Sequence, residues 1–448
     1  MTTPTDGLHF DGAPDVASYP GPESKRRLAR QDELEGNAVL YPDSIPLAFE
    51  EAKGATLKDA DGNLYLDFFA GIGVANVGHC NPEITEAAAS QAETLTHALD
   101  FPTEVRLDLV EKLGEISPME SPKVTFGGPT GSDAVEASIK LAKQFTGNRG
   151  LIAFRGSFHG ETSGAFSLTA DQKQKEQYTP LLPEVQHVQY PAPFYQDRTP
   201  ERAVEESLAD LERVLGERYG GMANPAGVWV EPIQGEAGVI VPPEGFLRGV
   251  RELCDEYGVP LIADEVQTGF GRTGEWWGSD HDGVVPDVIT MAKAFGAGYP
   301  LSGIMYREEL DTWGPGGHTG TFRGFAAGMA AGLRSIEYIE EHDLVAHSRE
   351  LGAKLKSRLR ETVGSQDIVG EVRGRGLYIG IPFVDSAGNP DSETMGAVRD
   401  ACYERGAAVW GGGRAGHVMR LMPPLVMTEE QAMTGAGIVA DAVAAVAN

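Results

Sequence analysis

The stretch DVITMAKAFGAGYP, residues 287–300, decides the fold and raises the first question about function. Its apolar part, Val288 to Met291, lies between a proline and a glycine-rich turn, as a buried central strand of an α/β sheet would. Lys293 follows at the end of this strand. A lone lysine there is most often on the surface, because lysine is rarely buried without a partner. The alternative is an amine kept in a desolvated place for Schiff-base chemistry.

The surrounding sequence alternates short apolar strands with helical stretches from about residue 83 to about residue 345. The predicted strands are KVTFGG, GLIAFRG, AGVWVEP, VPLIADE and DVITMA. PEGFLRGVRELCDEYG has apolar residues at helical spacing, and Gly258 ends it. This alternation predicts an α/β fold with a mostly parallel sheet and helices on both faces.

The two flanks predict a smaller second domain. The first 35 or so residues resemble an arm that becomes helical at Pro22, and ATLKDADGNLYLDFFAG indicates a hairpin with an Asp-Gly-Asn turn. One long helix is predicted near 325–362, with strands and further helices after it. The predicted division is an N-terminal arm with strands joining the small domain (1–80), a large domain (81–330) and a small α+β C-terminal domain (331–448).

Composition excludes some classes of partner. The 448 residues include 37 basic and 66 acidic side chains, a net charge of −29, so binding to nucleic acid or to an anionic membrane is not expected. Only 12 of the basic residues are lysines. Lysine poverty with acidic excess resembles proteins of salt-loving organisms, and a merely acidic chain is the alternative.

The cysteines and the apolar runs indicate a reducing, cytoplasmic setting. Cys80, Cys254 and Cys402 are too few and too far apart for a disulfide framework or a cysteine-rich metal site. The first residues lack a basic start with an apolar core after it, and no apolar run is long enough to span a bilayer. We therefore expect no leader segment and no membrane partner.

A glycine-rich turn in VTFGGPTGSDAVEASIKLAKQF precedes a helix that starts near Ser132. Free N–H groups at a helix start form a ready phosphate site, to which Thr130 and Ser132 could add hydroxyl groups. An ordinary turn capped by Ser132 is the equal alternative. The turn lacks the lysine of a nucleotide-binding P-loop, so a nucleoside triphosphate is not the expected ligand.

An acid and a lysine are predicted at the same sheet edge as this turn. Asp264 ends the strand in VPLIADEVQTGFGRTG, and ligands of open α/β sheets bind beyond the carboxyl ends of strands. Taken alone, Asp264 could equally cap the next turn. Pyridoxal 5′-phosphate (PLP) needs a phosphate cradle, a carboxylate for its pyridine nitrogen and a lysine. Together, Ser132, Asp264 and Lys293 favour PLP, and no metal is required.

A second glycine motif, GGGRAG at 411–416, matches the dinucleotide-binding pattern. The residues after it, HVMRLMPPL, indicate a strand, whereas that mechanism needs a helix start there. We therefore predict a hairpin turn and no nicotinamide site.

Four longer stretches carry a family resemblance. WVEPIQGEAG, LIADEVQTGFGRTG, PDVITMAKAFGAGYPLSG and HTGTFRG together resemble the class III (omega) aminotransferases of fold type I, from about residue 35 to the end. By this resemblance, Lys293 forms a Schiff base with PLP and carries the proton, and Asp264 pairs with the pyridine nitrogen. The other implied cofactor contacts are Val266, Gln267, Phe158 and His159 at the ring and Thr130, Gly131 and Ser132 at the phosphate.

The resemblance also implies partners and substrates. Thr321 would reach the phosphate in a partner subunit, so a homodimer is expected and a larger assembly is left open. Arg373, in EVRGRG, would bind the α-carboxylate of glutamate or 2-oxoglutarate, and Glu236 would neutralise this arginine when an ω-amine enters. Without the family motif, Arg373 would be interpreted as a surface arginine and Glu236 as a solvated loop glutamate.

Glu161 departs from the family pattern. The 4-aminobutyrate and ornithine enzymes usually have an arginine directly after the HG of SFHG, where this chain has Glu161. A carboxylate there should repel a carboxylate-tipped substrate and could instead receive the ammonium at the far end of a diamino acid. The departure leaves the far carboxylate of 2-oxoglutarate without its usual cation, and Arg323 of GTFRG is the proposed substitute.

These observations predict transfer of the terminal amine of 2,4-diaminobutyrate to 2-oxoglutarate, giving aspartate 4-semialdehyde and glutamate. The chain is most similar to diaminobutyrate:2-oxoglutarate aminotransferases. A 4-aminobutyrate or ornithine aminotransferase is the alternative, and an aminomutase or decarboxylase is less favoured. A non-enzymatic binding protein would not need Lys293 and Asp264 together.

Overall fold

A computed structural model describes residues 7–217 and 219–447. It contains two compact units, the described parts of Met1–Pro82 with Ala346–Asn448, and Glu83–Val345. The three-segment division by role stays a proposal, because compactness does not test what a segment does.

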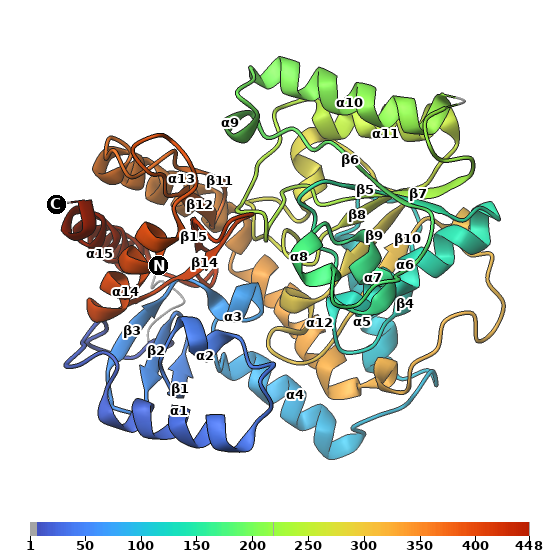
Figure 1. Cartoon of the computed structure of the whole chain (residues 1–448). Helices are drawn as coiled ribbons and strands as arrows, with labels where there is room; N and C mark the ends of the chain where they lie inside the picture. The colour runs from blue at the N-terminus through green and yellow to red at the C-terminus, as the bar shows by residue number, and fades with distance from the viewer. Residues whose placement is uncertain (1–6, 218, 448) are drawn as a thin grey trace. The chain divides into compact units, whose positions relative to one another are not determined.

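The larger unit is built on a seven-stranded sheet with the order β4-β10-β9-β8-β7-β5-β6 (Figure 1). The strands from β9 to β6 are parallel, and β10 runs antiparallel to both β9 and β4. The predicted mostly parallel α/β sheet is therefore confirmed, with one reversed strand. The strands are β4 (Lys123–Phe126), β5 (Gly150–Phe154), β6 (Val185–Val188), β7 (Pro225–Val230), β8 (Leu261–Asp264), β9 (Val288–Met291) and β10 (Gly303–Tyr306).

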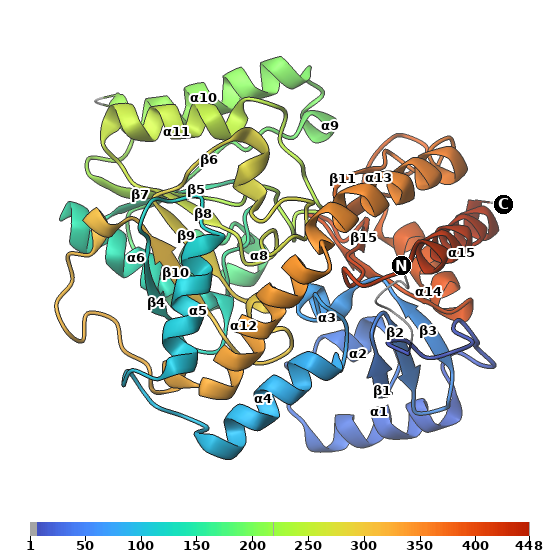
Figure 2. The same cartoon turned by 180° about the vertical axis from the view of Figure 1, so that it is seen from behind.

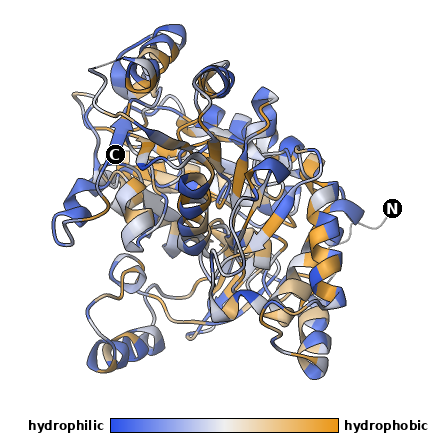
Figure 3. Cartoon of the chain, turned by 90° about the vertical axis from the view of Figure 1, so that its right-hand side faces the viewer, coloured by the Kyte–Doolittle hydropathy of each residue, from blue (hydrophilic) through white to orange (hydrophobic). Residues whose placement is uncertain are grey.

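Helices cover both faces of this sheet, which explains its near-continuous apolar strands. Ile152 and Phe154 of β5 pack in one core with α10 (Pro200–Gly216) and α11 (Phe246–Tyr257). Leu151 of the same strand packs on the other side with α6 (Gly131–Thr146) and α7 (Ser163–Leu168). Figure 2 shows the same layers from behind, and Figure 3 shows hydrophobic residues in the strands and a mixture of hydrophobic and hydrophilic residues along the helices. The central strands are thereby fixed on both sides.

The predicted long helix near 325–362 is wrong in one respect, because it is two helices. The first, α12 (Ala326–Glu341), ends at His342, and α13 (Leu344–Val363) follows. Asp343 between them has a φ of +49°, a left-handed conformation that aspartate tolerates better than most residues and that stops a helix. The other helices and 3₁₀ turns of the larger unit are α4 (Pro82–Thr94), α5 (Glu104–Glu115), α8 (Gln172–Lys175), α9 (Pro193–Gln196), η1 (Gly278–Asp282), η2 (Lys293–Gly296), η3 (Glu308–Leu310) and η4 (Thr321–Gly324).

The smaller unit contains two four-stranded sheets, β1-β2-β3-β13 and β11-β12-β15-β14. The predicted hairpin is confirmed by β2 and β3, and β13 joins β3 from the far end of the chain. The turn at 411–416 joins antiparallel strands β14 and β15, so it opens no helix and is the predicted hairpin turn. The strands are β1 (Phe49–Lys53), β2 (Thr56–Asp59), β3 (Leu64–Asp67), β11 (Arg373–Arg375), β12 (Tyr378–Pro382), β13 (Ala407–Ala408), β14 (Trp410–Gly412) and β15 (Val418–Leu421).

Helix α1 (Pro22–Leu34) begins at Pro22 as predicted, since proline suits the first helical position. The remaining helices of this unit are α2 (Tyr41–Ser44), α3 (Ala70–Gly73), α14 (Ser392–Glu404) and α15 (Glu429–Ala447), and α13 belongs to it from Ala346 onward. Across the described residues, we find no helix that is both long and apolar enough to cross a bilayer.

Candidate active site

Five chain segments leave the large sheet at the same edge. Strands β5, β7, β8 and β9 are parallel, and β4 shares their direction because both β4 and β9 are antiparallel to β10. In such a sheet the carboxyl ends of the strands form the usual ligand-binding edge. The segments at this edge are 127–132, 155–160, 231–236, 264–267 and 292–293.

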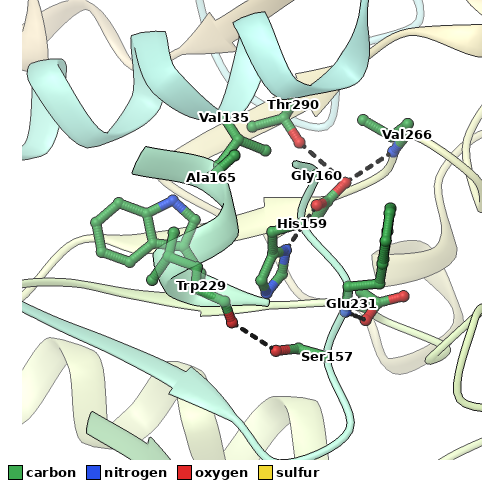
Figure 4. Close-up of polar contacts among 12 residues, drawn as sticks. Val135, Ser157, His159, Gly160, Ala165, Trp229, Glu231, Val266 and Thr290 are labelled. Carbon is green, nitrogen blue, oxygen red and sulfur yellow. Dashed lines mark hydrogen bonds and ion pairs between the residues drawn. The ribbon is translucent and has the colours of Figure 1, made fainter. Parts of the chain in front are cut away.

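Asp264, the last residue of β8, is a buried carboxylate at this edge and is only 5% exposed. Its Oδ2 lies 2.7 Å from Nδ1 of His159, and its Oδ1 accepts from Val266 N and Thr290 Oγ1, each at 3.1 Å (Figure 4). An ionised carboxylate can only accept, so His159 Nδ1 carries the hydrogen in that state. Three donors from three segments therefore hold one negative charge in a place with little water.

His159 is also fixed by a backbone hydrogen bond to Thr169, which follows it in the chain. Its backbone N–H donates to Thr169 Oγ1 at 2.8 Å, and its ring is buried. Among the described residues, its Nε2 has no hydrogen-bond partner. The structure thus brings the predicted residues His159 and Asp264 into direct contact. Thr169 and Thr290, which orient them, were not predicted.

Lys293 begins η2 directly after β9 and Ala292. Its φ of +49° is unusual for a residue with a side chain. Backbone strain of this kind gathers at functional sites, where the surrounding fold holds a side chain in a required direction. Strands β8 and β9 are neighbours, with Asp264 opposite Thr290, so Lys293 leaves the sheet beside the carboxylate.

The start of α6 packs against the ends of β8 and β9. A Cβ on Gly131 would lie 2.9 Å from Val266 Cγ1 and 3.6 Å from Ala292 Cβ, so only glycine fits there without a shift. The N–H groups of Gly131 and Ser132 make no hydrogen bond to the described residues, as expected at the first positions of a helix. The sequence predicts an anion site at this helix start, and that role stays a prediction.

Two side chains next to this site have defined partners. The Thr130 backbone N–H and hydroxyl both donate to Asp133 Oδ2, at 2.9 and 2.8 Å, in a capping box. Ser132 Oγ accepts the N–H of Glu161 at 3.1 Å. A Cβ on Gly160 would lie 2.2 Å from Ser132 Oγ. The proposed phosphate residue Ser132 and the proposed substrate residue Glu161 are therefore neighbours.

Two buried glutamates follow β7 and β8 and were not among the predicted site residues. Glu231 accepts the N–H groups of Phe158 and Gly235, and Glu265 accepts those of Gly278 and Ser279. Burial raises the pKa of each carboxyl to about 7, against the effect of these hydrogen bonds. Glu231 could have been found from the sequence, because like Asp264 it directly follows a predicted apolar strand.

Other predicted residues of the larger unit lie on loops or in the 3₁₀ turn η4. Gln267 Nε2 donates to Glu236 Oε1 at 3.2 Å, joining the loops after β8 and β7. Arg323 pairs with Asp100 and donates to the His318 carbonyl. Thr321 and Arg323 line a cavity of about 480 Å³.

Arg373 belongs to the smaller unit. It begins β11, is buried and pairs with Glu371 on its own chain segment.

Comparison with protein families shows which family the chain belongs to. The model of the family described as aminotransferase class-III matches residues 41–443. The chain belongs to the class III aminotransferases. It is similar to the diaminobutyrate–2-oxoglutarate aminotransferase of Rhizobium meliloti (strain 1021), with 39% identity over 422 residues that cover 90% of this chain and 89% of the relative.

Other relatives carry different names. An acetylornithine aminotransferase of Methanosarcina mazei is 40% identical over 86% of this chain and 89% of its own length. An alanine/serine racemase of Pyrococcus horikoshii is 36% identical over 93% of this chain and 90% of its own length. Among solved structures, a Bacillus anthracis aminotransferase superposes with a TM-score of 0.88 at 28% identity, covering 96% of this chain and 100% of its own. The fold type I architecture is thus shown.

Class III aminotransferases use PLP, and the sheet edge fits this cofactor. The fit rests on the helix start at Gly131, where a larger residue would clash, on the buried carboxylate of Asp264 and on Lys293 just after the next strand. A phosphate, a pyridine nitrogen and an aldehyde need these three kinds of group.

Proposed function

We propose that this aminotransferase moves the terminal amine of 2,4-diaminobutyrate to 2-oxoglutarate. The observation that carries the proposal is the position of Glu161. This residue is exposed at the sheet edge, and its backbone N–H donates to Ser132 Oγ. Relatives named for this reaction support it. The products are aspartate 4-semialdehyde and glutamate.

Some residues at this sheet edge bind the cofactor, and Lys293 transfers protons. When bound, PLP receives an amine nitrogen and draws electrons from the carbon that carried it. The Asp264 carboxylate holds a proton on the pyridine nitrogen, and its burial strengthens this charge pairing. The Lys293 Nζ removes the proton from the donor carbon next to the nitrogen and returns one in the second half of the reaction. The N–H groups of Gly131 and Ser132 and the Ser132 hydroxyl bind the phosphate. The Thr130 hydroxyl joins them by exchanging Asp133 for the phosphate.

The ring contacts are proposed for four side chains. Phe158 and Val266 cover the two ring faces, His159 supports Asp264, and Gln267 donates to the ring hydroxyl. Because Gln267 also contacts Glu236 at 3.2 Å, the cofactor side and the substrate side of the site share a hydrogen bond.

Substrate ends are distinguished by charge. Glu161 forms an ion pair with the ammonium group at the far end of a diamino acid, away from the reacting amine, and repels a carboxylate. Arg373 binds the α-carboxylate of the keto acid as a bidentate pair, and Glu236 neutralises it for an ω-amine. Arg323 supplies the charge for the far carboxylate, which requires it to exchange Asp100 for the substrate.

The test is a charge reversal at Glu161. Purified protein is mixed with 2,4-diaminobutyrate or 4-aminobutyrate, without keto acid, and the loss of the cofactor's visible absorbance is followed. E161R should reverse the donor preference by roughly tenfold or more, the factor expected for one charge pair. E212R, an equal charge change at an exposed position of α10, is the control and should keep the native preference. An unchanged preference in E161R rejects the role of Glu161.

We further propose that the active unit is a homodimer in which Thr321 reaches the partner's phosphate. Phe101 and Phe322 are 71% and 68% exposed, and Phe101 lines the cavity that contains Thr321. Apolar side chains exposed this far often mark an interface. Sedimentation velocity should give a dimer for the native protein and monomers for F101E. An active monomeric native protein would contradict the proposal.

A further inference from the structure

Glu231 occupies an unusual place for a charged residue. It comes directly after β7, beside β8 and its terminal Asp264, and is 7% exposed. Burying a carboxylate costs free energy unless hydrogen bonds compensate. A buried carboxyl group kept at this edge therefore needs a reason beyond filling space.

Its two carboxylate oxygens serve two different loops. Oε1 accepts the N–H of Phe158 at 2.9 Å, and Oε2 accepts the N–H of Gly235 at 2.8 Å. The first loop follows β5, and the second follows β7. Figure 4 shows Glu231 in the same group of side chains as His159 and Val266. A neutral amide has only one acceptor oxygen, so it cannot satisfy both N–H groups.

Neighbouring hydrogen bonds further fix the two loops that Glu231 joins. Gln234 Nε2 donates to the Arg155 carbonyl at 3.0 Å, and Tyr190 Oη donates to the Glu231 carbonyl at 3.1 Å. The two loops are thus joined at two points, and the strand end is fixed from a third. Glu236 follows Gly235 directly, so the position of its backbone is set by the same hydrogen bond.

We propose that Glu231 is a positioning residue that couples the cofactor side of the site to its substrate side, by holding Phe158 and Glu236 through one carboxylate. This inference rests on the proposed roles of Phe158 at the PLP ring and Glu236 at the substrate. Glu231 itself touches neither group. Loss of one of its two acceptor oxygens frees one loop or the other, so cofactor affinity and substrate KM change together.

The test compares E231Q with D287N. Asp287 is also buried and also binds a backbone N–H, that of Leu261, but it precedes β9 at the opposite edge of the sheet. For E231Q we expect the dissociation constant of PLP from the apoprotein and the KM for 2-oxoglutarate each to rise about tenfold, the effect of one lost charge-assisted hydrogen bond. D287N should lower the melting temperature without these changes.

Amide hydrogen exchange gives a readout that does not depend on activity. Peptides containing Phe158 and Gly235 should exchange faster in E231Q than in the native protein, and D287N should leave both unchanged. Equal effects of E231Q and D287N on PLP affinity, KM and exchange would overturn the inference. If E231Q does not fold, E231D serves, because its shorter carboxylate keeps the charge but cannot span both loops.

The two proposals can fail separately. Native protein that binds no PLP or transfers no amine refutes the proposed function, whatever Glu231 does. Native protein that transfers the amine, with E231Q unchanged in affinity, KM and exchange, refutes the inference alone.

Discussion

At the scale of single residues, the proposed chemistry depends on where two charges are held. Asp264 is fixed by hydrogen bonds from three segments, and Lys293 leaves the neighbouring strand in a left-handed conformation. Their proximity follows from the adjacent parallel strands β8 and β9. The sequence pattern predicted that both strands end at one edge of the sheet, but not that they are neighbours. The supporting contacts of Thr169 and Thr290 did not follow, because a hydroxyl on a distant segment leaves no periodic signal.

Replacement of Lys293 tests its role directly. K293A should lose at least about a thousandfold in amine transfer, because the proton-transfer base is absent. It should also release PLP on gel filtration, since no covalent attachment remains. K175A is the control, because Lys175 is a buried lysine of the larger unit that donates to the Ser167 carbonyl and lies outside the predicted site. Transfer by K293A close to the native rate would contradict the assignment.

The pH dependence of stability should carry a signature of Glu265. Burial raises its pKa from 4.5 to about 7, so between these values the native state keeps a proton that the unfolded chain has lost. This stabilising contribution is complete below pH 4.5 and is lost as the pH rises through about 7. Urea unfolding at about pH 5 and about pH 8 should show a smaller pH effect in E265Q than in the native protein. An identical effect in both proteins would contradict the shift.

At the scale of elements, the strands and helices around the site were largely predictable. Strands β4, β5, β7, β8 and β9 were found from apolar runs, and α11 from helical spacing. Strands β6 and β10 were missed. In β6, the sequence VQHV is half polar, so it shows no apolar run. The break between α12 and α13 was missed because only the φ of Asp343 marks it.

The turn at Gly160 links two elements of the site and gives an element-scale prediction. Gly160 has a φ of +121°, and a Cβ there would meet Ser132 Oγ at 2.2 Å. G160A should therefore push the 160–165 segment from the start of α6 and weaken PLP binding. G147A, at the other end of α6, has a φ of +70° and open space, so it should cost about 1 kcal/mol of stability without loss of PLP affinity. Titration of both apoproteins with PLP measures the difference, and equal affinities would contradict the coupling.

At the scale of the whole molecule, charge is the dominant feature. A net charge of −29 destabilises the compact state by self-repulsion unless salt screens it. The melting temperature should rise when sodium chloride increases from about 0.1 M to about 1 M, as the Debye length falls from roughly 10 Å to roughly 3 Å. Sucrose at equal osmolality is the control for exclusion effects. A melting temperature that rises equally in sucrose, or does not rise in salt, would contradict the role of charge.

The central claim is terminal amine transfer, and an isotope label tests it most directly. The native protein with PLP is given 2,4-diaminobutyrate carrying ¹⁵N only on its terminal amine, together with 2-oxoglutarate, and the products are followed by NMR. The account predicts ¹⁵N-labelled glutamate and unlabelled aspartate 4-semialdehyde. When 2-oxoglutarate is omitted, no more than one equivalent of donor per site should be converted. Unlabelled glutamate, or continued turnover without 2-oxoglutarate, would contradict it.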